Sequence, residues 1–426
     1  MASPMASQSV SSVCNYLGCT EPAPLKCSRC KQVKYCSKDH QRRDWKAHKA
    51  RCVVPPAPLS SVAHSPSLGR YLVSARSIPQ ATTVLSEPPL IPPVLHDREA
   101  PLRCPYCFSA SPPHPSCLSK VKASEELRQD REGEARANEA LKPHRAPPTV
   151  VLAARVLRRV FPPRGEGGDS KFMSLTSNVE VMESSLKSKL REMAALSIRY
   201  YNLSRAGPPI VEPGLDDSLG ILARINQNAF TIADSELQPI GIGIYHQAAT
   251  TVNHSCSPTM VSSFVFRETE PPQLQMRTIV NVEAGLELSN SYIDTGRCTV
   301  DRRAELLSSY CFSCSCAACK YGARHDASAS QYAEVAAAGL RVQQLIDEQR
   351  FEEAALTLKS ALPAYEKALF AKSPNLGIQL YKCCKLLEYC EKDLQLAADC
   401  RRKAEEILSV AFGEDDALVK EIKARF

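Results

Sequence analysis

The run Asn253-His254-Ser255-Cys256 and, further along, the cluster Cys314-x-Cys316-x-x-Cys319 say most about how this chain folds. The cluster places three thiolates within one tight turn. A zinc ion prefers four tetrahedral ligands, and sites made of four cysteines are closed and structural. The cluster is one ligand short, and Cys256 is a candidate for the fourth. Between the two motifs, Ser291-Tyr292-Ile293-Asp294 places a tyrosine at the end of an apolar stretch. The sequence therefore predicts a zinc site built from two segments.

A second group of potential metal ligands lies close to the N-terminus. Cys27-x-x-Cys30 and His48-x-x-x-Cys52 have spacings typical of metal sites, and eight ligands are enough for two zinc ions. The alternative, that some of these side chains are simply buried thiols, explains their density poorly. The eight cysteine and histidine residues are Cys14, Cys19, Cys27, Cys30, Cys36, His40, His48 and Cys52.

These motifs, taken together and in this order, point to a known family. The Asn-His-Ser-Cys run, the Ser-Tyr pair and the following cysteines resemble a SET domain with its post-SET segment. The N-terminal pattern, including Tyr35-Cys36-Ser37 and Asp44-Trp45, resembles a MYND finger. Nearly the whole chain therefore resembles the SET-and-MYND-domain lysine methyltransferases. The resemblance implies an α+β protein with a SET β-fold, a helical insert, an N-terminal MYND zinc finger and a zinc-binding post-SET segment.

The resemblance also implies how the zinc ligands pair. In the finger, pairing alternates along the chain, and we expect three zinc ions in total, two in the finger and one in the post-SET segment. Cys14 and Cys19 are separated by four residues where two are usual, and His40 replaces a cysteine, although imidazole is a legitimate zinc ligand. The two implied sets in the finger are Cys14, Cys19, Cys36 and His40, and Cys27, Cys30, His48 and Cys52.

Length and composition agree with a multidomain protein of a reducing compartment. The 426 residues are enough for two to four domains with real cores. The chain has 19 cysteines, but residues 1–10 are polar and lack the apolar region of a signal peptide. No apolar run approaches the ~20 residues of a membrane span. We therefore expect zinc sites and free thiols rather than disulfides, no membrane association, and a location in the cytoplasm and nucleus.

The positive charge is concentrated in the finger. The net charge is +7, and residues 26–51 contain ten Lys or Arg against two Asp. Such a segment could contact nucleic acid phosphates, but a solvated helix face on a small finger is the better interpretation. MYND fingers typically dock proline-containing peptides, so we expect proline-rich partners here. We also expect a protein substrate, histone or non-histone, and a monomer.

Composition shifts suggest where the domains begin and end. Residues 53–67 are rich in Pro, Ser and Ala and read as a linker, and alternating patterns at Leu72-Val73 and Val84-Leu85 predict strands. The expected order is a disordered tail (1–13), the finger (14–52), the linker (53–67), SET strands (68–103), an insert that is partly charged or disordered and then helical (104–205), the SET core (206–295), the post-SET segment (296–322) and a helical domain (323–426).

The helical domain has a weak internal repeat. Residues Phe351, Ala354, Ala355, Ala361, Tyr365 and Ala368 correspond in type to Leu394, Ala397, Ala398, Ala404, Leu408 and Ala411. Small and large residues at this spacing suit stacked helical hairpins of the tetratricopeptide type. These helices also carry cysteines that we interpret as packed thiols rather than ligands. They are Cys383, Cys384, Cys390 and Cys400.

The finger is not where the family places it. In the family it is inserted after the first SET strands, whereas here it precedes them. At the usual insertion point lie Cys104, Cys107, His114 and Cys117. These four could bind a further zinc ion or be what is left of a decayed finger, and their spacing favours neither interpretation.

By resemblance, three aromatic residues form the lysine tunnel. Tyr292 is the catalytic tyrosine at its floor, and its hydroxyl orients both the amine and the methyl group of the cofactor. Tyr310 and Phe230 line the tunnel. Phe230, like Phe312 two residues before the cysteine cluster, is also compatible with ordinary core packing.

The implied cofactor is S-adenosylmethionine. Asn253 binds its methionine part, His254 contacts the adenine largely through the backbone, and Phe312 lies beside the adenine. In the family a Gly-x-Gly lets the backbone approach the cofactor, and here the run is Gly69-Arg70-Tyr71. Arg70 would face the cofactor carboxylate. A tyrosine does not readily take positive φ, so Tyr71 departs from the family pattern.

Two functions follow. The first is an S-adenosylmethionine-dependent protein-lysine N-methyltransferase acting on histone (chromatin) or non-histone lysines, favoured by Tyr292 with Asn253 and His254. The alternative is a catalytically weak SET-fold adaptor that recruits proline-rich partners through the finger, favoured by Tyr71. A zinc-finger transcription factor is more distant, because no recognition-helix pattern appears.

Overall fold

The chain divides into two compact units, Met1–Pro58 and Leu59–Phe426. The structure is a computed structural model that describes residues 13–52, 57–110, 115–162, 169–205, 207, 211–321 and 329–425. The expected tail falls outside these ranges up to residue 12, and so do residues 53–56 of the expected linker. His114 also lies outside the described residues.

The first unit is a small finger with one helix. Its strands β1 (Leu25–Lys26) and β2 (Lys34–Tyr35) pair antiparallel, and α1 (Lys38–His48) and η1 (Lys49–Arg51) follow. The Ser37 hydroxyl accepts a hydrogen bond from the His40 amide at 3.1 Å and so caps α1. Because residues four apart share one helix face, α1 turns His40, Asp44 and His48 toward the strands.

The strands of the second unit form three small antiparallel sheets. The pairs and orders are β3–β4, β5–β10–β9 and β6–β8–β7. The bounds are β3 Ser60–Ser65, β4 Gly69–Ser74, β5 Thr83–Glu87, β6 Ile91–Leu95, β7 Ala229–Ala233, β8 Pro239–Ile244, β9 Met260–Val265 and β10 Gln273–Thr278. Apolar side chains of these sheets meet in one core that includes Leu72, Leu85, Ile232, Tyr245 and Met276.

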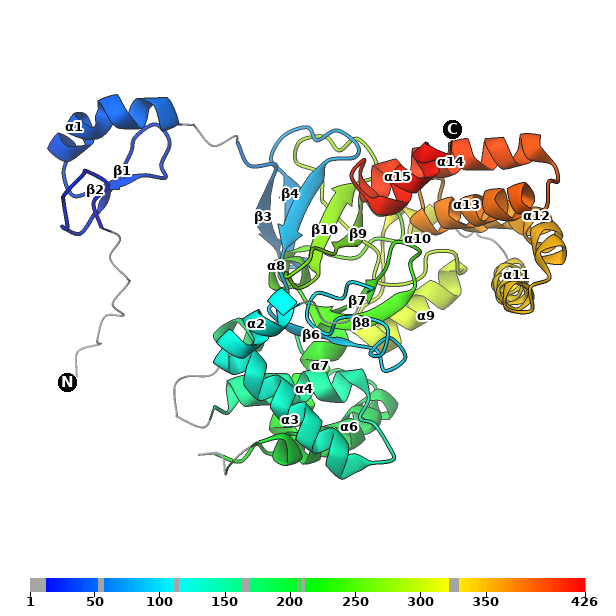
Figure 1. The fold of residues 1–426 in the computed structure, drawn as a ribbon, viewed down its shortest axis with the longest axis horizontal. Coiled ribbons are helices and arrows are strands. Elements are labelled where there is room, and N and C mark those ends of the chain that lie inside the picture. Colours follow the sequence, from blue (N-terminus) through cyan, green and yellow to red (C-terminus); the bar gives the residue numbers. More distant parts are fainter. Residues whose placement is uncertain are drawn as a thin grey trace. The chain divides into compact units, whose positions relative to one another are not determined.

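A helical layer covers β6 and β8. Helix α4 is buried over most of its length and packs on both strands and on α6 and α7, and α3 also packs on α6 (Figure 1). Its apolar residues face this layer, while Arg155, Arg158 and Arg159 pair with acidic side chains of α3. The helices are α2 Pro115–Ala123, α3 Glu125–Leu141, α4 Pro148–Val160, α5 Ser170–Met173, α6 Ser184–Ser204, α7 Leu215–Asn228 and α8 His246–Thr251.

The charged part of the insert, which the sequence predicts to be partly charged or disordered, is helical in the structure. It forms α2 and α3, and Asp130 of α3 is buried. Arg158 of α4 donates to Asp130 at 2.7 Å and Arg159 at 3.0 Å. The two guanidinium groups lower the pKa of the Asp130 carboxyl, although burial alone would raise it. Charges that look solvated in the sequence are therefore paired across the helix interface.

Two boundaries also differ from the sequence-based expectation. The linker predicted for 53–67 contains β3, because Ser60–Ser65 forms a regular ladder with Gly69–Ser74. The alternating pattern of residues 274–282 predicts a strand over that whole range, but β10 ends at Thr278 rather than Val282. Val282 instead makes an isolated bridge to Ile78, so the chain turns away from the sheet earlier than its apolar pattern suggests.

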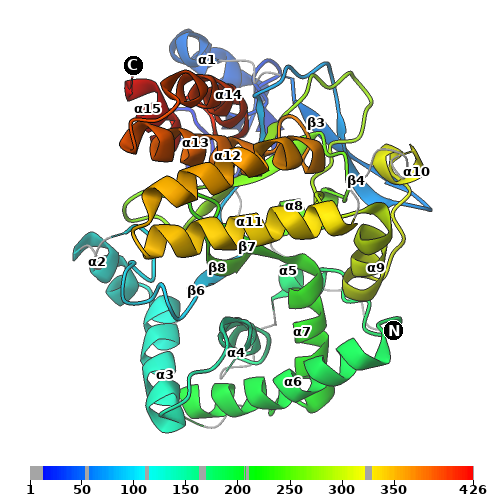
Figure 2. The ribbon, with the colours of Figure 1, turned by 90° about the vertical axis from the view of Figure 1, so that its right-hand side faces the viewer.

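The remaining helices follow the strands and pack on their neighbours in sequence. In Figure 2, α11, α12 and α13 lie side by side, and α14 packs on β9 and β10. Among the described helices, none is both long and apolar enough to cross a membrane. The bounds are α9 Thr299–Tyr310, α10 Ala317–Tyr321, α11 Ala329–Asp347, α12 Phe351–Ala368, α13 Pro374–Tyr389, α14 Leu394–Phe412 and α15 Ala417–Ala424.

Two helical glycines provide a matched test of this packing. A Cβ at Gly133 of α3 would lie 2.5 Å from the backbone oxygen of Ser204, whereas one at Gly220 of α7 would make only ordinary contact, 3.5 Å from Arg224. Gly133→Ala should therefore lower the free energy of unfolding by about 1–3 kcal/mol, and Gly220→Ala should raise it by about 0.4–1 kcal/mol. Urea unfolding of both variants measures this. Equal effects would show that α3 does not pack closely on α6.

Candidate functional site

Two loops cross beside the small sheets. The loop after α8 carries Asn253 and His254, and the segment after β10 carries Asn290. His254 and Asn290 form a parallel bridge. The Ser255 amide donates to the Asn290 carbonyl at 2.9 Å, and the Asn290 amide donates to the Asn253 carbonyl at 3.0 Å. The Asn-His-Ser-Cys and Ser-Tyr motifs, far apart in sequence, are thereby held side by side.

The imidazole of His254 strengthens this crossing. Its Nδ1 accepts the Tyr292 amide at 3.0 Å, and its Nε2 lies 3.2 Å from the Cys256 sulfur. Burial lowers the pKa of His254 to about 4, so the ring is neutral and Nδ1 is free to accept. His254 thus links the backbone before Tyr292 to the cysteine site.

Four cysteine sulfurs meet next to this crossing. Cys256 joins Cys314, Cys316 and Cys319, and all four sulfurs lie within 4.8 Å of one another. The sulfurs of Cys256 and Cys319 are 3.5 Å apart. The backbone turns at Cys316, whose carbonyl accepts the Cys319 amide at 3.0 Å. Four thiols in this arrangement fit the closed tetrahedral site of a structural zinc ion.

The finger gathers its eight ligand residues into two groups. In each group the ligand atoms lie within 4.8 Å of one another, and both sets fit zinc. Within them, the Cys36 sulfur is 3.1 Å from Nδ1 of His40, and the Cys30 sulfur is 3.5 Å from Nε2 of His48. The groups are the two sets that the resemblance implies, namely Cys14, Cys19, Cys36 and His40, and Cys27, Cys30, His48 and Cys52.

Asp44 supports the finger without being a ligand. It is buried, and its carboxylate accepts hydrogen bonds from the Tyr35 hydroxyl at 2.7 Å and from the Asn15 side chain at 3.2 Å. This network joins α1, β2 and the N-terminal loop. The ten basic side chains of residues 26–51 take no part in it, and most are exposed.

Three predicted tunnel residues line one cavity of about 220 Å³. Tyr292 and Tyr310 have ring centroids 5.2 Å apart, and the Tyr310 hydroxyl donates to the Tyr292 carbonyl at 3.3 Å. Phe230 enters from β7 and meets the Tyr245 ring edge-on at 5.8 Å. The cavity is therefore walled by aromatic rings from three separate segments.

The described residues that line this cavity include no acidic or basic side chain. Its polar groups are hydroxyls and amides, among them Gln227, Ser262 and Asn290. Ser262 and Asn290 are not among the cofactor, tunnel or metal residues that the sequence predicts. The only available signal was that Asn290 lies two residues before Tyr292 and Ser262 lies in an alternating strand. A cavity without a carboxylate offers an ammonium ion no counter-ion, and desolvation disfavours the charged form.

The Tyr292 hydroxyl lies at one end of this wall and is fixed in place. It donates to the Val252 carbonyl at 2.6 Å. Burial raises the pKa of Tyr292 above its usual range, so the hydroxyl stays protonated at neutral pH. Its oxygen retains lone pairs that can accept a hydrogen bond from a group inside the cavity.

The residues expected to contact the cofactor lie in the surrounding segments. Gly69 begins β4 with φ +65°, and a Cβ built there meets nothing within 4 Å. The Asn253 side chain donates to the Leu68 carbonyl at 3.3 Å. The Phe312 ring lies 5.9 Å from that of His254. Arg70 is exposed. An open backbone, an amide and an aromatic face fit an adenosine-containing ligand.

Tyr71 does not need the positive φ that the second glycine of the family pattern suggests for this position. It pairs with Ala63 within the β3–β4 ladder. Among the described residues with positive φ, this run contributes only Gly69. The position that family members fill with a second glycine is thus ordinary extended backbone here, and the tyrosine occupies it without strain.

Comparison with known families agrees with this geometry. Residues 69–293 match the SET domain model, and residues 13–52 match the MYND finger model. The chain belongs to the SET-domain family. The finger match ends before the SET match begins, so the MYND finger precedes the SET domain here instead of being inserted in it.

Several curated proteins resemble part of the chain. Histone-lysine N-methyltransferase SMYD3 of Mus musculus is 28% identical over 225 residues, 52% of this chain and 50% of that protein. Histone-lysine N-methyltransferase ASHR1 of Arabidopsis thaliana is 29% identical over 282 residues, 62% of this chain and 56% of that protein. N-lysine methyltransferase SMYD2 of Homo sapiens is 29% identical over 177 residues, which cover 40% of this chain and 38% of that protein. The chain spans about half the length of the first two.

A solved structure is also similar. It is the SET domain of LSMT bound to lysine and AdoHcy, with a TM-score of 0.38 and 14% identity over 90% of this chain and 91% of that one. A likeness of this strength adds nothing to the family match.

Removing one post-SET ligand should have two separable effects. Cys316→Ser should lower the zinc content by one ion per chain, measured by elemental analysis. Because structural zinc binding contributes folding free energy, it should also lower the melting temperature. Cys390→Ser, which removes a half-buried thiol of the helical domain, is the control and should keep the full zinc content. An unchanged zinc count in Cys316→Ser would show that Cys316 is not a required ligand of this cluster.

Proposed function

We propose that this chain is a protein-lysine N-methyltransferase that uses S-adenosylmethionine and acts on lysines of histone or non-histone proteins. The uncharged aromatic cavity that ends at the Tyr292 hydroxyl carries the proposal. The SET family match and the names of the partial relatives, which are histone-lysine and N-lysine methyltransferases, support it.

The cavity suits a neutral lysine amine. A free lysine has a pKa of about 10.4 and is charged at neutral pH. Inside a cavity without a carboxylate, the ammonium form loses its hydration and gains no counter-ion, so its pKa falls. The rings of Tyr292 and Tyr310 are tilted against each other with centroids 5.2 Å apart, and they form one aromatic wall along which the aliphatic part of the side chain would lie. The amine is then available as a nucleophile.

Tyr292 would position this amine. Its hydroxyl proton is engaged by the Val252 carbonyl at 2.6 Å, which leaves the oxygen as an acceptor for an amine N–H. Orienting the lone pair of the amine toward the incoming methyl group is the main contribution that a protein makes to such a displacement.

The residues around Gly69 fit the cofactor. S-adenosylmethionine, when bound, supplies an electrophilic sulfonium methyl group. Gly69 offers open backbone, Asn253 and His254 lie at the loop crossing, and Phe312 offers a ring next to His254. We assign the methionine part to Asn253, the adenine to Phe312 and the His254 backbone, and the cofactor carboxylate to Arg70.

The second candidate is an adaptor with little activity. The departure at Tyr71 favours it, since a half-buried ring stands where family members have glycine. Under this proposal the MYND finger recruits proline-rich peptides. Its exposed basic side chains would add only weak binding of nucleic acid. The free cysteines support the cytoplasm and nucleus as the location, and we expect a monomer.

Tyr292→Phe tests the enzymatic proposal. It removes only the hydroxyl, so methyl transfer from S-adenosylmethionine to a lysine peptide should fall by roughly 10- to 100-fold, about 1.4–3 kcal/mol. Tyr365→Phe is a matched control, because the Tyr365 hydroxyl is also buried and donates to a backbone carbonyl, that of Val335 at 3.2 Å. It should keep wild-type activity.

The outcome separates the two candidates. Equal rates for wild type and Tyr292→Phe would remove the role assigned to this tyrosine. If calorimetry detects no S-adenosylmethionine binding to wild type or to Tyr71→Gly, the adaptor function takes over. Tighter cofactor binding by Tyr71→Gly alone would indicate that the ring crowds the cofactor.

Deleting residues 1–58 tests whether the finger is separable, since the chain divides there into two units. The truncated protein should transfer methyl groups to a short peptide within about twofold of wild type, the scatter expected when no contact to the reacting groups is lost. It should no longer capture proline-rich peptides. The full chain with Cys30→Ser, which removes a finger ligand, should behave in the same way. Loss of cofactor binding on truncation would instead make the finger part of the SET fold.

A further inference from the structure

A fourth group of cysteines lies outside both the finger and the post-SET segment. Cys104 and Cys107 follow β6, and Cys117 lies in α2. The three sulfurs lie within 4.8 Å of one another, and the three residues are at most 1% exposed. No role in the SET domain described above requires thiols at this place.

The first two cysteines form a tight turn. The Phe108 amide donates to the Cys104 carbonyl at 2.9 Å, and the Cys104 amide donates to the Ser109 carbonyl at 3.0 Å. Phe108 has φ +61°, a left-handed conformation that costs a non-glycine residue roughly 1–2 kcal/mol. The turn brings the sulfurs of Cys104 and Cys107 to the same side of the backbone.

The finger contains the same turn at one of its zinc sites. After Cys27 and Cys30, the Lys31 amide donates to the Cys27 carbonyl at 2.9 Å, and the Cys27 amide donates to the Val33 carbonyl at 2.8 Å. Lys31 has φ +56°. Both turns therefore share the Cys-x-x-Cys spacing, the left-handed residue after the second cysteine and the bond back to the first. In the finger this turn presents two thiolates to one ion.

Cysteines that are simply packed in a core have a different local structure in this molecule. Cys383 and Cys400 also interact through their sulfurs, but they lie on the neighbouring helices α13 and α14 and belong to an apolar core. Both lie inside helices, so neither is directly followed by a left-handed residue. The cluster after β6 departs from that pattern and follows the pattern of the finger.

An ion bound to this cluster would connect two segments that lie next to the strands of the aromatic cavity. Phe108 is fully buried, and its ring carbons lie 3.3 Å from where a Cβ on Gly241 of β8 would be. Strand β8 pairs with β7, which carries Phe230. An ion joining Cys104 and Cys107 to Cys117 would tie the loop after β6 to α2 and fix Phe108 behind the strands that form the aromatic cavity.

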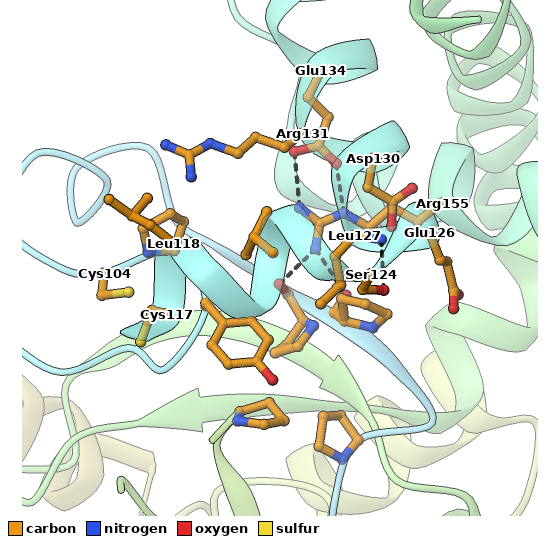
Figure 3. Close-up of a pocket in the computed structure, with 17 residues that line it drawn as sticks. Cys104, Cys117, Leu118, Ser124, Glu126, Leu127, Asp130, Arg131, Glu134 and Arg155 are labelled. Atoms are coloured by element: carbon orange, nitrogen blue, oxygen red, sulfur yellow. Dashed lines mark hydrogen bonds and ion pairs between the residues drawn. The ribbon is translucent and has the colours of Figure 1, made fainter. Parts of the chain in front are cut away.

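Two of the three cysteines border a cavity. Figure 3 shows Cys104 and Cys117 next to each other at the edge of a cavity of about 280 Å³, close to Leu118 and on the side away from the Arg155–Glu134 pair. Tyr106 also lines this cavity. The cavity therefore leaves space for a further ligand next to these two cysteines.

We propose that Cys104, Cys107 and Cys117 bind one further zinc ion as three thiolate ligands. A group other than these three completes the tetrahedral shell, since zinc prefers four ligands. The thiol protons are released to solvent on binding. The full chain then holds four zinc ions, and the additional ion is structural.

Zinc counting tests the proposal in the full chain. Elemental analysis and native mass spectrometry of freshly purified wild type should both give four ions. Cys117→Ser should give three, and Cys390→Ser, a half-buried thiol of α13's C-terminal end, should keep four. Combining Cys117→Ser with Cys316→Ser should leave two, because the clusters share no ligand.

Two results would overturn the proposal. One is a wild-type count of three ions that stays at three in Cys117→Ser. The other is a disulfide between any two of these cysteines in protein that is denatured and alkylated directly after purification. The wild-type count decides the question even if Cys117→Ser does not fold.

Discussion

The crossing of the loops at His254 and Asn290 is the constraint on which the site depends. One backbone bridge, made of two amide hydrogen bonds, holds the two segments together. The same loop continues into Cys256, and the same strand end continues into Tyr292. Any ion held by Cys256 therefore also fixes the wall in which Tyr292 and Tyr310 face each other. Cysteine ligation and the aromatic cavity are two results of a single crossing.

The lining of the cavity matters for the charged side chains that it lacks as much as for the hydroxyl and amide groups that it has. Hydroxyl and amide groups can satisfy one another there, while the nearest carboxylate that influences Tyr292, Glu287, is itself held with a raised pKa by burial. Burial therefore disfavours the charged form of this carboxyl, as it does that of the Tyr292 hydroxyl. The surroundings of Tyr292 thus consistently disfavour charged forms of any group that enters.

The sequence was most informative where chemistry is local. Most of the expected zinc ligands are cysteines or histidines at short spacing, and the structure groups all twelve residues of the three expected clusters. The alternate pairing in the finger and the place of Cys256 followed from the family resemblance. The family match confirms the SET and MYND resemblance. Sequence patterns failed where the partner is distant. The charges of α3 looked solvated because Arg158 and Arg159 lie on another helix. Strand β3 looked like a linker because its pairing with β4, and not its composition, makes it a strand.

The cavity residues show the same division. Tyr292 stands out because it lies between two motifs, but Ser262 reaches the cavity only through the pairing of β9 with β10. Likewise, the Gly-x-Gly pattern of the family predicts a positive φ at Tyr71, and a tyrosine with positive φ would be strained. Its φ is set by the ladder with Ala63, which a single sequence does not reveal.

The wide separation of Cys256 from its three partners has a consequence for the unfolded chain. The three cysteines that follow Phe312 lie close together, but Cys256 is 58 positions before Cys314, so an ion held by all four closes a loop that contains β9, β10 and α9. By the chain-entropy relation for cross-links, a closed loop of this length removes about 4 kcal/mol of disorder from the unfolded ensemble, against about 3 kcal/mol for a loop of some fifteen residues. This one ion thus works as a reversible long-range cross-link, and it restricts the conformations that the loop between the two cysteine segments can take in the unfolded chain.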